Sequence, residues 1–237
     1  MRGAMAKASV YTALNLLFFA LIGTALLALT YELTRDPIAR SEEAEKLKLI
    51  TQIAPPSAYD NDIMKDTLQL PADALLGNKD TTIAYLGRLK GLPSIAVIHA
   101  TAADGYSGKI RLIIAIHSDG QGNGKIGGVR VVSHKETPGL GDYIEIGRNK
   151  WITIFNGTSL DHPKDAWKVK KDGGQFDYMT GATITPRAVV KAVHKALQYF
   201  ETNRDKMFTP HRQEKIKPEK ITPEIITPEK FKPKKLQ

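Results

Sequence analysis

The stretch IAVIHATAADGYSGKIRLIIAI, residues 95–116, decides the fold class because it carries two apolar runs on either side of a polar, glycine-containing turn. Comparable runs at 83–86 and 129–132 flank it, separated by clusters of Gly, Asp, Asn and Pro. Short runs of this kind between turn-forming residues are typical of antiparallel strands. We therefore expect an antiparallel sheet between residues 81 and 134, with the glycine-rich segment 118–124 closing one hairpin.

The hydrophobic spacing becomes helical over residues 186–200. Val189, Val193 and Leu197 fall on one face of a helix, and lysines fall on another. We expect this amphipathic helix to pack on the sheet, with His194 among the lysines on its solvent-facing side. A sheet packed with helices predicts an α+β domain, which we place at residues 61–209.

The N-terminal stretch VYTALNLLFFALIGTALLAL, residues 10–29, contains no charged residue. At ~1.5 Å per residue it is long enough to cross a hydrocarbon layer of ~30 Å. A cleaved signal peptide is the alternative, but its apolar core is usually only ~7–15 residues long, and no strong small-x-small cleavage site follows. We therefore favour an uncleaved transmembrane anchor over residues 8–30.

Charges on either side of this anchor suggest its orientation. Arg2 and Lys7 precede it, whereas acidic and basic residues are mixed after it. This positive-inside bias places residues 1–7 in the cytoplasm and the rest on the periplasmic side of the inner membrane. Residues 31–60 are expected to form a juxtamembrane helix, over 38–53, and a linker.

Residues 210–237 differ from the rest because IKPEK, ITPEI, ITPEK and FKPKK repeat with proline in third place. Proline at this spacing forbids a helix or a central strand, so we expect a disordered, Pro/Lys-rich extension. Its net charge of +4, eight basic against four acidic residues, is a large part of the +9 of the whole chain. Nucleic acid is therefore not an expected partner. A solubilising tail is favoured over electrostatic contact with anionic lipid or an acidic partner.

Redox chemistry in this chain would require a bound organic cofactor. The sequence has no cysteine, which excludes disulfides, thiolate iron–sulfur clusters and thiol redox centres. No metal-ligand spacing accompanies the histidines, and the glycine-rich hairpin matches neither a calcium loop nor a dinucleotide-binding pattern.

The segment DYMTGATITPR, residues 177–187, is the strongest candidate for such a site. It presents the hydroxyl of Thr183 after Gly181 and Ala182, whose minimal side chains let a bulky group approach the backbone. Thr185 is expected to cap the following helix, with Pro186 as its first residue.

The N–H groups and positive dipole end of that helix would then lie beside Thr183. A phosphodiester there would be stabilised by these groups and by Arg187.

The string Asp177-x-x-Thr180-Gly181-Ala182-Thr183 resembles the flavinylation motif of the FMN-binding domain family, although Thr180 stands where the family more often has serine. The resemblance implies FMN attached to Thr183 as a phosphoester by a flavin transferase that uses FAD as donor. Together with the anchor, the motif is similar to the G-subunit family of Rnf ion-translocating electron-transport complexes, which is related to the C subunits of sodium-pumping NADH:quinone oxidoreductases.

A second match runs from Gly105-Tyr106-Ser107-Gly108-Lys109-Ile110, through the glycine hairpin, to the segment 134–141 (HKETPGLG), in the order and spacing of the same family. The resemblance places the loop with Thr137 and Leu140 against the flavin ring, although Pro-Gly chemistry also suits a simple tight turn. Tyr106 either contacts the flavin or belongs to the core. The candidate cofactor-binding residues are Thr183, Thr180, Gly181, Ala182, Thr185, Asp177, Tyr106, His134, Glu136, Thr137, Leu140 and Arg187.

The resemblance implies an electron relay within a multi-subunit complex that transfers electrons between ferredoxin and NAD and moves Na⁺ or H⁺. The subunit alone would catalyse no turnover, and its partners would be the other membrane and redox subunits. A membrane-anchored scaffold or binding protein without flavin remains the alternative. A self-sufficient flavin reductase is also open, but no dinucleotide fingerprint supports it.

Overall fold

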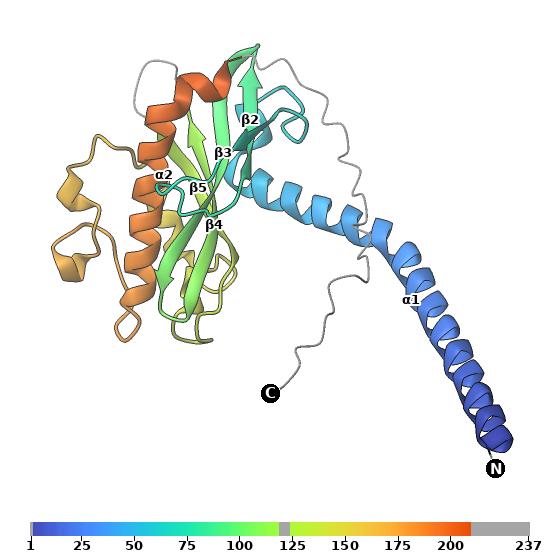
Figure 1. The fold of residues 1–237 in the computed structure, drawn as a ribbon. Helices are drawn as coiled ribbons and strands as arrows, with labels where there is room; N and C mark the ends of the chain where they lie inside the picture. The colour runs from blue at the N-terminus through green and yellow to red at the C-terminus, as the bar shows by residue number, and fades with distance from the viewer. Residues whose placement is uncertain (1, 119–123, 210–237) are drawn as a thin grey trace, which may run out of the picture.

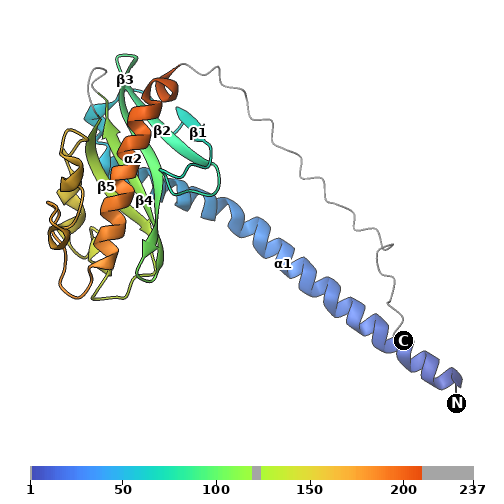
Figure 2. The same ribbon diagram turned by 60° about the vertical axis from the view of Figure 1, so that its left-hand side comes forward.

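The computed structural model describes residues 2–118 and 124–209. A long N-terminal helix, α1 (Arg2–Ile53), projects from an α+β domain, in which a second helix, α2 (Ile184–Phe208), lies along a sheet (Figures 1 and 2). The expected fold class is thus confirmed. The strands are β1 (Thr67–Leu70), β2 (Thr82–Leu89), β3 (Leu92–Gly105), β4 (Gly108–His117) and β5 (Lys125–Ser133). Single turns of 3-10 helix occur at Pro56–Ala58, Asp142–Ile144, Lys164–Ala166 and Lys170–Asp172, and a longer one at Lys150–Phe155.

The sheet is antiparallel throughout, and its spatial order, β1-β2-β3-β4-β5, is the order of the sequence. β3 and β4 form its centre, with Ile98 opposite Ile114. Side chains of a strand alternate between the two faces, so Leu112 and Ile114 join the core under α2, whereas Ile113 joins a smaller core on the other face. The four predicted strands are present, and β1, a short edge strand, was not predicted.

Helix α2 covers one face of the sheet with a stripe of buried residues that includes Val189, Val193 and Leu197, as its spacing predicted. The expectation that His194 faces solvent is wrong. Its ring is half-buried and stacks on Trp167, with centroids 5.0 Å apart and an interplanar angle of 8°. The loop that carries Trp167 folds over the helix, a long-range packing that local spacing cannot reveal.

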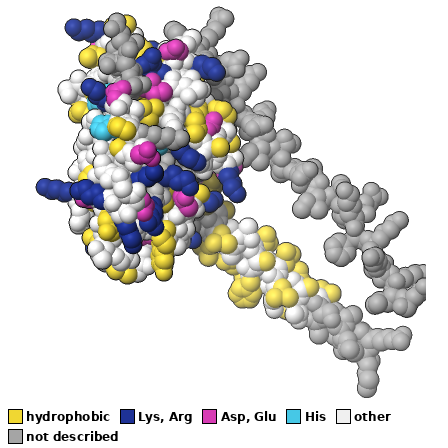
Figure 3. All heavy atoms as spheres, turned by 90° about the vertical axis from the view of Figure 1, so that its left-hand side faces the viewer, with side chains coloured by type: hydrophobic (Ala, Val, Ile, Leu, Met, Phe, Trp, Pro, Cys, Tyr) yellow, Lys and Arg dark blue, Asp and Glu magenta, His cyan; other side chains and the backbone are white. Residues whose placement is uncertain are grey.

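Helix α1 is continuous across the boundary expected between the anchor and a separate juxtamembrane helix, and it contains Pro37. The segment Val10–Ile38 is long and apolar enough to cross a membrane, and its apolar side chains are exposed along the projecting helix (Figure 3). The end of α1 is different, because Ile50 and Ile53 are buried against the sheet face opposite α2. One helix therefore joins this apolar segment directly to the domain. The glycine-rich turn at 119–123 and the tail at 210–237 lie outside the described residues.

Candidate functional site

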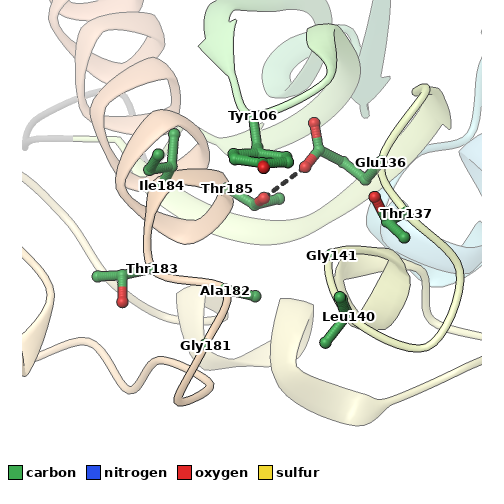
Figure 4. Close-up of a pocket in the computed structure, with 10 residues that line it drawn as sticks. All are labelled: Tyr106, Glu136, Thr137, Leu140, Gly141, Gly181, Ala182, Thr183, Ile184 and Thr185. Atoms are coloured by element: carbon green, nitrogen blue, oxygen red, sulfur yellow. Dashed lines mark hydrogen bonds between the residues drawn. The ribbon is translucent and has the colours of Figure 1, made fainter.

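Three segments far apart in the sequence meet around a cavity of about 200 Å³ (Figure 4). They are the β3–β4 turn, the loop after β5, and the turn that leads into α2. The cavity is lined by Tyr106, Glu136, Thr137, Leu140, Gly141, Gly181, Ala182, Thr183, Ile184 and Thr185. The structure thus gathers eight of the candidate residues in one place, all except Asp177, Thr180, His134 and Arg187.

Glu136 holds the three segments together. Its side chain is buried, with only 4% of the residue exposed. One carboxylate oxygen accepts a hydrogen bond from the backbone N–H of Ser107 at 3.0 Å, and the other accepts one from the hydroxyl of Thr185 at 2.5 Å. Both oxygens act as acceptors, which is the role of an ionised carboxylate. Gly105 and Gly141 approach so closely that a Cβ on either would lie within 3 Å of a carboxylate oxygen.

His134 supports Glu136 from outside the cavity. Its Nδ1 accepts the backbone N–H of Glu136 at 2.9 Å, and its Nε2 lies 2.7 Å from a carboxylate oxygen of Glu145. Since Nδ1 is an acceptor, the neutral ring carries its proton on Nε2 and donates it to Glu145. His134 therefore positions the loop and does not line the cavity.

The loop at 137–142 is a compact turn, as its Pro-Gly chemistry predicted. The carbonyl of Thr137 accepts hydrogen bonds from the N–H groups of Leu140 and Gly141 at 3.1 and 3.0 Å. A carboxylate oxygen of Asp142 accepts the N–H of Gly139 at 2.8 Å, and Gly139 has a positive φ of 77° that suits glycine. This turn presents Leu140, half of whose surface is exposed, at the wall of the cavity.

Buried aromatic side chains fix the segment that precedes Thr183. The indole N–H of Trp151 donates to the carbonyl of Asp177 at 2.7 Å, and the N–H of Met179 donates to the hydroxyl of Tyr143 at 3.3 Å. Burial raises the pKa of Tyr143 to about 12, so this phenol stays neutral. Gly181 then turns the chain with a φ of 89°, a left-handed conformation that side chains disfavour.

The expected capping of α2 by Thr185 is wrong. The helix begins at Ile184, and Thr183 is in the cap position without using its side chain as a cap. Thr185 lies inside the first turn, where its hydroxyl is buried and bonded to Glu136. The reason is long-range, because a buried carboxylate takes the hydroxyl that a cap would have used.

Thr183 consequently has a hydroxyl with no hydrogen-bond partner within residues 2–118 and 124–209. Its side chain lies at the rim and points away from Glu136 and Leu140 (Figure 4). The N–H groups of Ile184 and Thr185 open beside it, at the positive end of a long helix.

The remaining candidates lie away from the cavity. Arg187 forms a bidentate ion pair with Asp172, at 2.5 Å for each contact, which raises the pKa of Arg187 and lowers that of Asp172. Arg187 thus lies outside the lining of the cavity, and a contact between it and a phosphate stays a prediction. Asp177 pairs with Lys170 at 2.6 Å, and Thr180 is exposed outside the lining.

Two lining residues, Gly141 and Ile184, were absent from the candidates. Gly141 is the last residue of the family-like segment 134–141, so the sequence pattern could have identified it as a candidate. Ile184 lies beside Thr183, and its 45% exposure marks an apolar side chain that the core does not use.

The arrangement fits a flavin phosphate. Tyr106, Leu140 and Ile184 are exposed apolar side chains suited to an aromatic ring, and the hydroxyl and N–H groups suit a phosphate. The cavity is smaller than the ~300–1,000 Å³ of pockets that enclose a ligand. Such a site would hold part of a flavin and leave an edge accessible.

Comparison with known families gives two matches that divide the chain as the fold does. Residues 105–198 match the FMN-binding domain, and residues 5–53 match the RnfG N-terminal region. The first range covers the cavity and most of α2, and the second covers almost all of α1.

Several relatives are named as the G subunit of an ion-translocating oxidoreductase complex. The protein from Pseudomonas aeruginosa (strain UCBPP-PA14) is 44% identical over 211 residues, which cover 89% of this chain and 97% of the relative. That from Aliivibrio fischeri (strain MJ11) is 43% identical, with 84% and 93% covered, and that from Vibrio cholerae serotype O1 (strain M66-2) is 44% identical, with 82% and 91% covered. With both regions matched and identity extending over most of its length, the chain belongs to the family of G subunits of ion-translocating oxidoreductase complexes.

Proposed function

We propose that this chain is the electron-carrying subunit of a membrane-bound, ion-translocating oxidoreductase complex and that it carries FMN covalently on Thr183. Family membership supports the electron-transfer role and the FMN. The observation that carries the covalent attachment is the Thr183 hydroxyl, which lies unengaged at the rim of the cavity and at the start of α2.

The proposed attachment uses FAD as donor and a flavin transferase as catalyst. The Thr183 oxygen would form a bond to the phosphorus of the FMN half as the bond to the AMP half breaks, and the hydroxyl proton is lost. The N–H groups of Ile184 and Thr185 would stabilise the resulting phosphodiester charge. Because Arg187 is engaged by Asp172, we assign it no direct role.

When bound, the flavin supplies the one- and two-electron redox chemistry. The residues of this chain hold and shield it. Tyr106, Leu140 and Ile184 would contact the ring, and Glu136 would keep the three walls in register through Ser107 and Thr185. The tether prevents loss of the cofactor by dissociation, and the shallow cavity leaves an edge for electron exchange with another subunit.

We place the domain on the periplasmic side of the inner membrane, with electron transfer between ferredoxin and NAD coupled elsewhere in the complex to Na⁺ or H⁺ movement. The positive-inside bias at Arg2 and Lys7 supports this side. A reporter enzyme active only in the periplasm, fused after Gln237, is expected to be active. Activity only of a cytoplasm-specific reporter would reverse the topology.

Attachment is tested by expressing the full chain together with a flavin transferase. We expect an FMN-sized increase in intact mass and fluorescence that remains on the chain after denaturation. Thr183→Val should abolish both and Thr183→Ser, which keeps the hydroxyl, should retain both. Thr202→Val, at an exposed threonine of α2 outside the motif and the cavity, is the control and should retain both. The proposal is wrong if Thr183→Val keeps the mass or the wild-type chain never gains it.

A further inference from the structure

A second cavity, of about 410 Å³, lies on the sheet face opposite α2, where α1 joins the domain. The end of α1 covers only part of this face, through Ile50 and Ile53. Beyond it, strands β2, β3 and β4 form the floor and the loop before β2 forms a rim. The lining includes Lys46, Lys79, Ile83, Tyr85, Lys109 and Arg111, and it shares no residue with the first cavity.

The cavity is strongly basic. Lys46, Lys79, Lys109 and Arg111 line it against a single carboxylate, that of Asp80. Among the side chains that the structure describes, none pairs with Lys79, Lys109 or Arg111. Elsewhere cations are commonly paired, and the face in Figure 3 mixes the two signs. Unpaired cations that converge on one cavity favour an anionic ligand.

The rim of this cavity is held in place before any ligand binds. Thr101 donates its N–H to the carbonyl of Leu76 at 2.7 Å and its hydroxyl to the side chain of Asn78 at 2.7 Å. Asn78 in turn donates to the carbonyl of His99 at 3.1 Å. Gly77 touches the backbone of Thr101 so closely that a Cβ would lie 2.2 Å from its carbonyl oxygen. The loop that carries Lys79 is therefore preorganised, which reduces the entropy cost of binding.

The floor offers apolar surface between the charges. Ile83 is 45% exposed, and the rings of Tyr85 and His99 lie 6.2 Å apart. Burial, with a further contribution from Lys46, lowers the pKa of His99, so this ring adds no charge near pH 7. A ligand with carboxylates and an apolar side chain matches this combination better than a small inorganic ion does.

A lipid headgroup is the first anion to consider beside a candidate membrane span, but the spacing along α1 disfavours it. Even if the hydrocarbon extended to Ile38, Lys46 follows by eight residues, or about 12 Å along the helix. The headgroup layer adds only about 5–8 Å on each side of the hydrocarbon. The basic segment 212–237 of this chain is also unsuitable, because its net charge is +4.

We propose that this basic cavity docks an acidic segment of a neighbouring subunit of the complex. Its carboxylates would pair with Lys109, Arg111 and the rim lysines, and an apolar side chain would lie on Ile83 and Tyr85. The contact would fix the domain relative to the membrane subunits and so fix where the first cavity points. The proposal rests on assembly into the complex and is independent of flavin attachment to Thr183.

The test uses the whole complex in its membrane, with Lys79 replaced by the photo-crosslinking residue benzoylphenylalanine. On illumination we expect a crosslink to another subunit, and sequencing by mass spectrometry should place it within a segment rich in Asp and Glu. In the same background, Lys109→Glu with Arg111→Glu should reduce the crosslink at least about tenfold, because repulsion replaces attraction. Salt at 1 M should reduce it by at least about the same factor, because it screens the attraction.

The matched control is Lys125→Glu with Lys150→Glu, which makes the same charge change at exposed lysines outside the cavity and should leave the crosslink unchanged. A crosslink confined to lipid, to residues 210–237 of this chain, or to a segment without acidic residues would overturn the proposal. Binding of the full chain to phosphatidylglycerol vesicles would also overturn it, if Lys109→Glu with Arg111→Glu abolishes that binding. Flavin fluorescence of the denatured chain, recorded on the same samples, reports the Thr183 proposal separately and should not change. If the variant with Lys109→Glu and Arg111→Glu does not fold, the proposal is judged by the segment to which the chain without these two substitutions crosslinks.

Discussion

At the scale of single residues, the first cavity depends on one buried carboxylate. Glu136 satisfies a backbone N–H of the β3–β4 turn and a hydroxyl of α2, 29 and 49 residues away in the sequence. Removing it would leave both donors without their acceptor, and an unpaired buried polar group costs roughly 1–3 kcal/mol.

We expect Glu136→Ala to lower the free energy of unfolding by about 3 kcal/mol, since two donors lose their acceptor. Glu136→Gln should cost less, about 1 kcal/mol, because the amide oxygen still accepts one bond and the Thr185 hydroxyl can turn to accept from the amide. Urea unfolding of the full chain in detergent measures both. The control, Asp104→Asn, breaks an exposed pair with Lys191 and should change little. Equal losses for Ala and Gln would contradict this account.

Arg187 follows the motif and was expected near the flavin phosphate, but in the structure it pairs with Asp172. Its pair with Asp172 is partly exposed, with 43% and 33% of the side chains accessible, and such pairs contribute only about 0–1 kcal/mol. We therefore expect Arg187→Gln to retain flavin attachment and to cost less than about 1 kcal/mol of stability. Attachment is measured by intact mass. Loss of the flavin with the fold intact would show that the guanidinium serves the phosphate after all.

At the scale of elements, the joint between α1 and the sheet connects the anchor to the domain. Ile53 is 2% exposed and packs against Gly128 of β5, where a Cβ would lie 2.8 Å from its side chain, while a Cβ on Gly127 would lie 3.1 Å from its carbonyl oxygen. Glycine at these positions lets the helix approach the strand closely. A continuous helix thus joins the apolar segment to a close-packed contact with the sheet.

Ile53→Ala is expected to destabilise the domain by about 2–5 kcal/mol, because it removes buried apolar volume from a joint with little room to collapse. Leu89→Ala, at a position that is 41% exposed, is the control and should cost much less. Thermal unfolding of both variants tests this. A small effect at Ile53 would mean that the joint is loose and that α1 does not orient the domain.

At the scale of the whole molecule, pH acts through two histidines. Burial lowers the pKa of His99, with a contribution from Lys46, and burial alone lowers that of His117. Below the ordinary value of about 6.5 the unfolded chain therefore binds more protons than the folded one, so the free energy of unfolding decreases as the pH decreases. Above pH 7 both histidines are neutral in both states, and this loss of stability disappears.

We expect the unfolding midpoint of the full chain to be constant between pH 7 and 8 and to fall between pH 6.5 and 5. Replacing His99 and His117 by Gln should remove most of this slope. Asp62 and Asp172, whose pKa values are lowered, act only at more acidic pH. Denaturant titrations at fixed pH measure the slope, and an undiminished slope in the double variant would assign it to other groups.

Much of the molecule follows from local patterns. The apolar alternation in residues 95–116 predicts β3 and β4, the spacing of Val189, Val193 and Leu197 predicts α2, and the uncharged run at 10–29 predicts the anchor. Each signal depends on neighbours a few residues apart, which the sequence displays directly. The motif at residues 180–183 points to Thr183 through its resemblance to the flavinylation motif, and attachment there stays a prediction.

Only the tertiary structure decided how side chains distant in the sequence pair. It pairs Thr185 with Glu136 instead of a helix cap, Arg187 with Asp172, and His194 with Trp167 instead of solvent. It also brings Lys46 of α1 to Lys109 and Arg111 of β4 around one basic cavity. Sequence spacing does not predict these pairings. They depend on which side chains come within reach of each other once the sheet and the helices pack together.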